Sequence, residues 1–244
     1  MDNLQDLISS LQEGDADTLL AVSPETVVVQ DQRLGRLEGK AGVARWVRAT
    51  ATWLNGLSAA PKELAFLVTP TRMVHELSFA IRVGSEVVDL PYVLVADRSA
   101  SGIVEYRTYH STWPYTGEHV FRPPPLVGRN HEEVPEIFRW YVDRVSVADV
   151  EAVLARFTED GYVREPSGER WKHQGSAARA KFYGHLVTAP RASFELMTST
   201  VVGATIAVEY GFSYGDVPMV GGICVMETRG GRIAAVRITD DVGA

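Results

Sequence analysis

Hydrophobic and polar residues follow first a helical and then a strand periodicity along this chain, and this order occurs twice. Apolar residues have helical spacing in residues 4–20 and again in 137–157. A short β-branched run follows each, TVVVQD at 26–31 and GYVRE at 161–165, and then a helix that begins at a glycine. The pattern predicts helix, helix, short strand and helix in each half of the chain.

Each half then ends in three long segments in which apolar and polar residues alternate, as in strands. They are residues 73–83, 87–97 and 102–110 in the first copy and 205–214, 218–228 and 231–240 in the second. Turn residues between the segments indicate an antiparallel meander in both copies.

This order predicts the α+β class, with two tandem cone-shaped domains, each a bent antiparallel sheet covered by helices. We expect a first domain at 1–111, a linker rich in proline, glycine and aromatic residues at 112–134, and a second domain at 135–244. Bent sheets closed by helices have an open mouth that suits a ligand pocket. We expect the outer sheet faces to pack as an intramolecular pseudo-dimer in a monomer, burying Tyr92, Leu94 and Cys224.

Composition narrows the partners. The 244 residues include 24 basic and 31 acidic side chains, a net charge of −7, and the basic residues are scattered. Nucleic acid and anionic membranes are therefore not expected as partners, and a small-molecule substrate is. A single cysteine and an N-terminus without a signal-like segment favour a cytoplasmic protein.

The segments RWYVDRVSVADVEAVLARF, DGYVREPSGE, GSAARAKFY and GRIAAVRITDD carry a family resemblance. The second half resembles the ketosteroid isomerase-like, SnoaL-like branch of the nuclear transport factor 2-like superfamily. Tyr141 lies 24 residues before Glu165, which opens the turn Glu165-Pro166-Ser167-Gly168, as in the isomerases. The resemblance implies that Glu165 is a general base and Tyr141 an oxyanion donor in an apolar pocket. Glu165 could instead be a surface acid that pairs with Arg164 or Arg170.

Ketosteroid isomerase also uses a second, protonated carboxyl group. The alignment places Ile223 at that position, and the loss of one such donor typically costs about 3 kcal/mol of transition-state stabilisation. Steroid isomerisation is therefore disfavoured, and another proton transfer in the same pocket is favoured.

Strand alternation, with the pocket face that the resemblance implies, predicts which further residues line the second pocket. The inward set is Val208, Tyr210, Phe212, Ile223, Val225, Val236, Ile238 and Asp240. Asp240 is a second candidate acid, and Tyr210, Phe212 and Trp171 are candidates to hold an aromatic ligand.

The first half keeps an acid, Asp31, at the position of Glu165, but has Leu7 at that of Tyr141. Alternation predicts inward His75, Leu77, Phe79 and Ile81, then Asp89, Pro91 and Val93, then Val104, Tyr106, Thr108 and His110. Asp31, His75, Asp89, Tyr106 and His110 would form a polar cluster with catalytic acids and histidines, or the histidines would be satisfied core residues. Trp46 and Trp53 would cover this pocket or pack in the core.

No phosphate-binding loop, GxSxG motif or HExxH run occurs, so no cofactor and no metal are expected. Three functions remain open. SnoaL-like relatives close rings in natural-product pathways, so the resemblance implies a cofactor-independent acid–base cyclase or isomerase of a small, largely apolar metabolite. One alternative is an epoxide- or aziridine-opening hydrolase, which is disfavoured because alternation predicts that Arg107 and Arg237 point away from the pocket. The other is a non-catalytic binding or protective module.

Overall fold

The computed structural model describes residues 6–126, 134–188, 191–216 and 218–240. Contacts between residues divide the chain into two compact units, Met1–Tyr109 and His110–Ala244. The predicted linker, 112–134, is thus grouped with the second unit, and its residues 127–133 lie outside the described part. One contact that ties it there is the hydrogen bond from the Gly221 N–H to the Arg122 carbonyl, at 3.1 Å.

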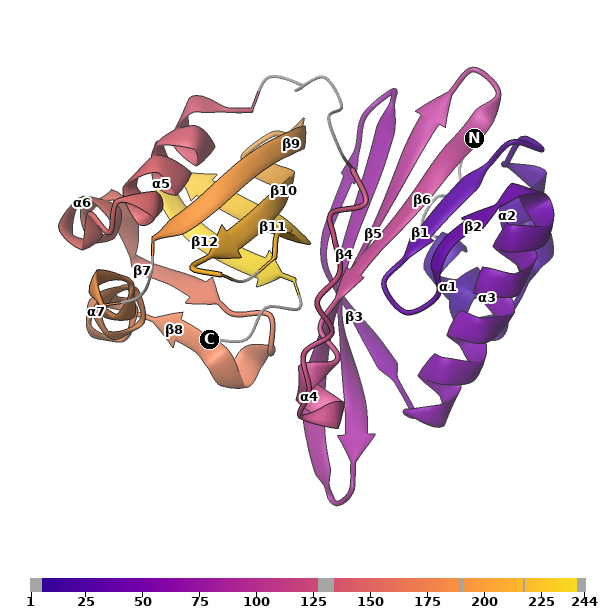
Figure 1. The fold of residues 1–244 in the computed structure, drawn as a ribbon, viewed down its shortest axis with the longest axis horizontal. Helices are drawn as coiled ribbons and strands as arrows, with labels where there is room; N and C mark the ends of the chain where they lie inside the picture. Colours follow the sequence, from indigo (N-terminus) through magenta and orange to yellow (C-terminus); the bar gives the residue numbers. More distant parts are fainter. Residues whose placement is uncertain (1–5, 127–133, 189–190, 217, 241–244) are drawn as a thin grey trace. The chain divides into compact units, whose positions relative to one another are not determined.

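In its described residues, 6–109, the first unit has three helices and six strands, which Figure 1 labels. The helices are α1 (Asp6–Glu13), α2 (Ala16–Ala21) and α3 (Gly39–Gly56). The strands are β1 (Val28–Asp31), β2 (Gly35–Glu38), β3 (Ala60–Val68), β4 (Arg72–Val83), β5 (Glu86–Ser99) and β6 (Gly102–His110), in the sheet order β2-β1-β6-β5-β4-β3.

The second unit repeats this plan after a short helix, α4 (Trp113–Thr116). Its other elements are the helices α5 (Glu136–Ser146), α6 (Val150–Arg156) and α7 (Ser176–Gly184), and the 3-10 turns η1 (Glu169–Trp171) and η2 (His185–Val187). Its strands are β7 (Phe157–Arg164), β8 (Lys172–Gln174), β9 (Ala192–Val202), β10 (Thr205–Tyr214), β11 (Val220–Arg229) and β12 (Arg232–Thr239), in the equivalent order β8-β7-β12-β11-β10-β9.

The α+β class and the tandem arrangement are confirmed, with two corrections. Each sheet is mixed, because β1 runs parallel to β6 and β7 runs parallel to β12. Each sheet also has strands that alternation does not reveal. β2 and β8 are only four and three residues long. β3, APKELAFLV, is an edge strand with a proline and charges, and such residues keep edges from pairing with other chains.

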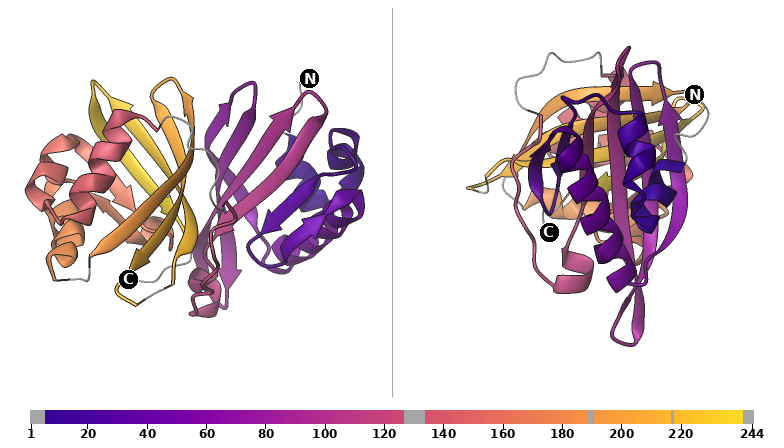
Figure 2. Two further views of the ribbon diagram at one scale, coloured as in Figure 1. Left: turned by 45° about the horizontal axis from the view of Figure 1, so that its top comes forward. Right: turned by 90° about the vertical axis from the view of Figure 1, so that its right-hand side faces the viewer.

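Helices α1, α2 and α3 lie on one face of the first sheet, and α5, α6 and α7 lie on one face of the second (Figures 1 and 2). Equivalent aspartates begin the second helix in both units. The Asp15 side chain accepts a hydrogen bond from the Asp17 N–H, and Asp149 accepts one from the Ala152 N–H. Such caps satisfy backbone donors that have no partner within the helix.

The predicted faces of the two central strands, β5 and β11, are wrong. Leu77 lies opposite Tyr92 and Val208 lies opposite Cys224, and residues directly opposite each other point to the same face. The helix side therefore carries Tyr92, Leu94 and Cys224 rather than Asp89, Pro91, Val93, Ile223 and Val225. In the first sheet the cause is the two-residue turn Gly84-Ser85, which pairs Val83 with Glu86 and thus odd-numbered residues with even-numbered ones.

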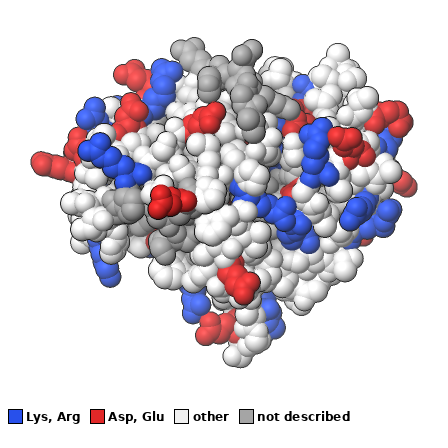
Figure 3. All heavy atoms as spheres, in the orientation of Figure 1, with Lys and Arg blue, Asp and Glu red and all other residues white. Residues whose placement is uncertain are grey.

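Within the described residues, no helix is long and apolar enough to cross a membrane. Acidic and basic side chains are interspersed on the face of the molecule that Figure 3 shows.

Candidate active site

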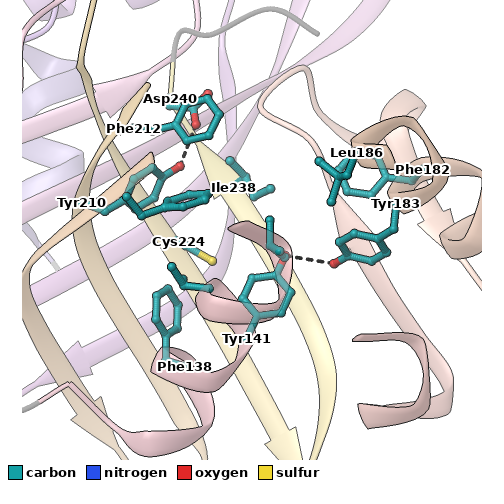
Figure 4. Close-up of a pocket in the computed structure, with 13 residues that line it drawn as sticks. Phe138, Tyr141, Phe182, Tyr183, Leu186, Tyr210, Phe212, Cys224, Ile238 and Asp240 are labelled. Atoms are coloured by element: carbon teal, nitrogen blue, oxygen red, sulfur yellow. Dashed lines mark hydrogen bonds between the residues drawn. The ribbon is translucent and has the colours of Figure 1, made fainter. Parts of the chain in front are cut away.

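A cavity of about 150 Å³ lies in the second unit, between α5, α7 and the helix side of the sheet (Figure 4). Its walls are almost wholly apolar. The lining residues are Phe138, Tyr141, Val142, Val145, Phe182, Tyr183, Leu186, Phe194, Tyr210, Phe212, Cys224, Ile238 and Asp240. The alternation of β10 and β12 places Tyr210, Phe212, Ile238 and Asp240 there, on the face predicted for them.

A carboxyl–phenol pair stands in this wall. The Tyr210 hydroxyl donates a hydrogen bond to Asp240 Oδ2 at 2.6 Å, and both residues are buried. Gly222 makes room for the pair: a Cβ atom there would lie 2.7 Å from the Tyr210 ring and 2.8 Å from Asp240 Cβ. Burial raises the pKa of the Tyr210 hydroxyl well above its usual value, and the Asp240 charge raises it further. Tyr210 thus stays a hydrogen-bond donor to Asp240 at neutral pH.

A second pair consists of two phenols. The hydroxyls of Tyr141 in α5 and Tyr183 in α7 lie 2.9 Å apart, and both side chains are buried (Figure 4). Burial raises the pKa of both tyrosines, so both are protonated at neutral pH. The pair has two hydroxyl hydrogens and uses one internally, which leaves the other to donate to a bound oxygen atom.

Cys224 lines the cavity where the sequence alignment had placed Ile223. The correction follows from the β10–β11 register, in which Cys224 lies opposite Val208. Neither residue supplies the second carboxyl group that ketosteroid isomerase uses. The carboxyl group of this cavity comes instead from the end of β12, at Asp240.

Glu165 occupies the predicted turn but does not line the cavity. The Gly168 N–H donates to the Glu165 carbonyl and closes the turn. The Glu165 carboxylate lies 2.5 Å from His173 Nε2, and the two side chains are only 15% and 22% exposed. The His173 ring stacks on Phe182 at 4.8 Å, and Phe182 lines the cavity. Phe182 therefore connects this acid–imidazole pair to the cavity wall.

Trp171, a predicted ligand contact, is not part of the wall. It is 41% exposed and meets the ring of Trp113 edge-on at 5.7 Å. Trp113 in turn stacks on His119. Trp171 thus belongs to an aromatic cluster beside the Glu165 turn.

In the first unit, Asp31 is buried and holds a turn together. Its Oδ1 accepts hydrogen bonds from the backbone N–H groups of Arg33 and Leu34, both at 2.9 Å. Its Oδ2 accepts from the Trp46 indole N–H and the Thr108 hydroxyl, both at 3.0 Å. A carboxylate with four donors is well satisfied, which favours a structural role over proton transfer.

The other polar candidates of the first unit do not form one cluster. His75 is buried and pairs through Nε2 with Glu63 on the edge strand, at 2.8 Å. Asp89 lies on the opposite face from His75, near the Ser78 hydroxyl. His110 is fully buried at the end of β6, at the position that Asp240 has after β12.

Large side chains fill the helix side of the first sheet. The Trp46 ring packs on Tyr106 at 5.2 Å, and the Tyr106 hydroxyl is bound to Ser23. Trp53 packs on Tyr92 and under the Arg33 guanidinium. The paired arginines Arg107 and Arg237, bound to Asp97 and Glu227, align the units with an offset of 130 residues. Tyr92 then takes the position of Gly222.

The helices align with other offsets, through the capping residues Asp15 and Asp149 and through Gly39 and Gly175, and they place apolar residues at the tyrosine pair. Leu7 stands at the position of Tyr141, and Val47 at that of Tyr183, and both are fully or almost fully buried. The first unit therefore has neither the glycine that opens the cavity nor the phenols that would bind an oxyanion. We accordingly place the candidate site in the second unit.

Among the polar side chains and the thiol of this region, Tyr183, Cys224 and His173 were not predicted as site residues. Tyr183 lies in the segment GSAARAKFY that carries the resemblance, so helical spacing within that segment was an available signal. Cys224 required the hairpin register. His173 becomes visible only when β8 pairs with β7 and places it opposite Val163. Among the described residues, no group of three or more His, Cys, Asp and Glu is suited to a metal ion.

Comparison with known proteins finds a family likeness in the second unit. Residues 138–236 match the model of the SnoaL-like domain. No curated protein gives a significant match.

Solved structures similar to this chain include a protein assigned as a polyketide cyclase from Sinorhizobium meliloti, with 27% identity over 43% of this chain and 94% of that one, at a TM-score of 0.38. The epoxide hydrolase/cyclase-like enzyme SalBIII of pyran-ring formation in salinomycin is 23% identical over 42% of this chain and 86% of that one, at a TM-score of 0.38. An NTF2-like protein of unknown function from Mesorhizobium loti is 21% identical over 47% of this chain and 99% of that one, also at a TM-score of 0.38.

Proposed function

We propose that the second-unit cavity is the active site of a cofactor-independent acid–base enzyme, because residues 138–236 match the model of the SnoaL-like domain. The reaction is the isomerisation or cyclisation of a small, largely apolar metabolite. One observation carries the proposal: a buried carboxyl group and a buried pair of phenols face the same apolar cavity.

Asp240 is the proton acceptor in this mechanism. Its carboxylate removes a proton next to a substrate carbonyl group, and Tyr210 fixes its orientation through the 2.6 Å hydrogen bond. The apolar wall excludes water, which strengthens the electrostatic attraction between the substrate and the fixed polar groups.

The Tyr141–Tyr183 pair stabilises the negative charge that develops on the substrate oxygen. One hydroxyl donates to the other, and the remaining hydrogen binds the oxyanion. A single donor of this kind is typically worth about 3 kcal/mol, or about 100-fold in rate. For cyclisation, the cavity also holds the flexible chain in a folded shape, which supplies part of the rate.

Glu165 with His173 forms a second acid–base pair behind Phe182. We propose that this pair has a smaller role than Asp240, because Glu165 does not line the cavity. Substitution of each acid tests which of the two contributes more to the rate.

The test measures the rate at which a small enolisable ketone takes up deuterium from the solvent. It compares wild type with Asp240→Asn, Tyr141→Phe and Glu165→Gln. We expect losses of at least 100-fold for Asp240→Asn and about 100-fold for Tyr141→Phe, and a smaller loss for Glu165→Gln. A binding module would instead hold the ketone without exchange in any variant. Equal activity of wild type and Asp240→Asn would contradict the proposal.

A ring-opening hydrolase would use the same pair differently. Asp240 would activate water, and a cavity phenol would protonate the epoxide or aziridine as it opens. Solvent labelled with ¹⁸O distinguishes the two, since hydrolysis places the label in the product and cyclisation does not.

A further inference from the structure

The cavity is small for a metabolite pocket. Its volume is about 150 Å³, whereas pockets for drug-sized ligands span roughly 300–1,000 Å³. An apolar cavity of about 150 Å³ engineered into the core of another protein binds benzene. The size of the second-unit cavity therefore corresponds to one six-membered ring and its substituents.

The walls favour a ring as well. Seven of the 13 lining residues are aromatic. Aromatic rings prefer offset or edge-to-face contacts with other rings, and these add to the free energy gained by burial. A planar ring can satisfy several such contacts at once inside this cavity.

The polar groups of the wall select a neutral ligand. Among the described lining residues there is no lysine, arginine or histidine, while Asp240 brings a carboxyl group. A ligand carboxylate or phosphate would lose its hydration without gaining a cation and would face Asp240. The remaining hydrogen of the Tyr141–Tyr183 pair requires an acceptor, which a carbonyl oxygen supplies.

We propose that the natural substrate class of this cavity is a neutral, single-ring or ring-forming compound with one carbonyl group. This inference rests on the proposed function for the identity of the site, and it adds the size, charge and polar group of the ligand. Compounds of several fused rings and compounds bearing a carboxylate or phosphate are excluded from the class.

Binding of four probes to the full chain, by calorimetry and thermal shift, tests the proposal without any catalysis. The probes are acetophenone (neutral, one ring, carbonyl), toluene (no carbonyl), benzoate (anionic, one ring) and progesterone (neutral, four rings). We expect saturable binding of acetophenone, weaker binding of toluene, binding of benzoate at least tenfold weaker than acetophenone, and no binding of progesterone.

Variants locate the binding. Val145→Phe fills the lining and should abolish acetophenone binding, while Val147→Phe, at a position 58% exposed on the same helix end, should leave it unchanged. Tyr141→Phe should weaken acetophenone about fivefold, the worth of one hydrogen bond, and leave toluene unchanged. This last comparison does not depend on Val145→Phe folding.

Progesterone or benzoate binding as tightly as acetophenone would overturn the inference, and so would binding of none of the four probes. Failure of the proposed function is seen separately, as acetophenone binding with no difference in proton exchange between wild type and Asp240→Asn.

Discussion

Gly222 of β11 lies directly opposite Tyr210 of β10, and the Tyr210 ring occupies the space that a side chain at position 222 would need. The same absence of a side chain lets Asp240 approach from β12. In the first unit the equivalent position is Tyr92, whose ring is buried in the interior. This exchange of glycine for tyrosine separates a unit with a described cavity from one whose interior is filled.

Gly222→Ala should therefore damage the site. The new methyl group would push Tyr210 and Asp240 apart, with a loss of about 1–3 kcal/mol in the free energy of unfolding from overpacking and a large loss of activity. Urea denaturation and ketone exchange measure the two effects.

The matched control is Gly184→Ala, because Gly184 has helical dihedral angles and a Cβ atom added there would meet no other atom within 4 Å. This substitution should leave activity intact and stability unchanged or higher by up to about 1 kcal/mol. Gly222→Ala behaving like Gly184→Ala would show that the close approach at Gly222 is unimportant.

Asp31→Asn should mainly lower stability, whereas Asp240→Asn should mainly lower activity. Asp31 accepts four hydrogen bonds, and an amide in its place brings donors toward donors, so we expect a loss of about 2 kcal/mol in unfolding free energy. Asn at 240 still accepts from Tyr210 and should cost under about 1 kcal/mol while removing activity. A stable Asp31→Asn protein with strongly reduced exchange would instead make the first unit catalytic.

Alkaline pH should unfold the protein through its cavity phenols. Tyr141, Tyr183 and Tyr210 have folded-state pKa values raised by burial above the ordinary 10.0. Their contribution is fully present below pH 10 and falls above it, because the unfolded chain then releases protons that the folded chain keeps. Urea denaturation from pH 8 to 11 should show this loss, and Tyr141→Phe should make it shallower; an equal slope in both proteins would contradict the assignment.

Acid should destabilise the first unit through His75. Burial lowers the pKa of its imidazole below 6.5, although Glu63 acts in the opposite direction. As pH falls below 6.5 the unfolded chain takes up a proton that folded His75 does not, so stability decreases. His75→Gln should reduce this decrease in urea denaturation between pH 7 and 5. Glu63→Gln, which removes the opposing partner, should increase it.

The family resemblance supplied Tyr141, and local pattern was enough to predict the repeat and part of the cavity wall. Tyr210, Phe212 and Asp240 follow from alternation within single strands, on the face that the resemblance implies. Each of these predictions needs only one element, and one element has a fixed period.

Relationships between elements were not predictable in the same way. The faces of β5 and β11 depend on hairpin register, and a shift of one residue reverses every side chain. The Glu165–His173 and Tyr141–Tyr183 pairs join residues 8 and 42 positions apart, on elements that meet only after folding. The parallel pairing of β7 with β12 likewise leaves no local pattern.

Deuterium exchange at the methyl group of acetophenone in D₂O, followed by proton NMR with wild type and Asp240→Asn, tests the central claim most directly. Asp240 would take a methyl proton, the Tyr141–Tyr183 pair would bind the enolate oxygen, and a solvent deuteron would return to carbon. We predict that wild type accelerates the exchange and that Asp240→Asn lowers it at least 100-fold, close to the rate without protein. Exchange as fast in Asp240→Asn as in wild type would contradict the account.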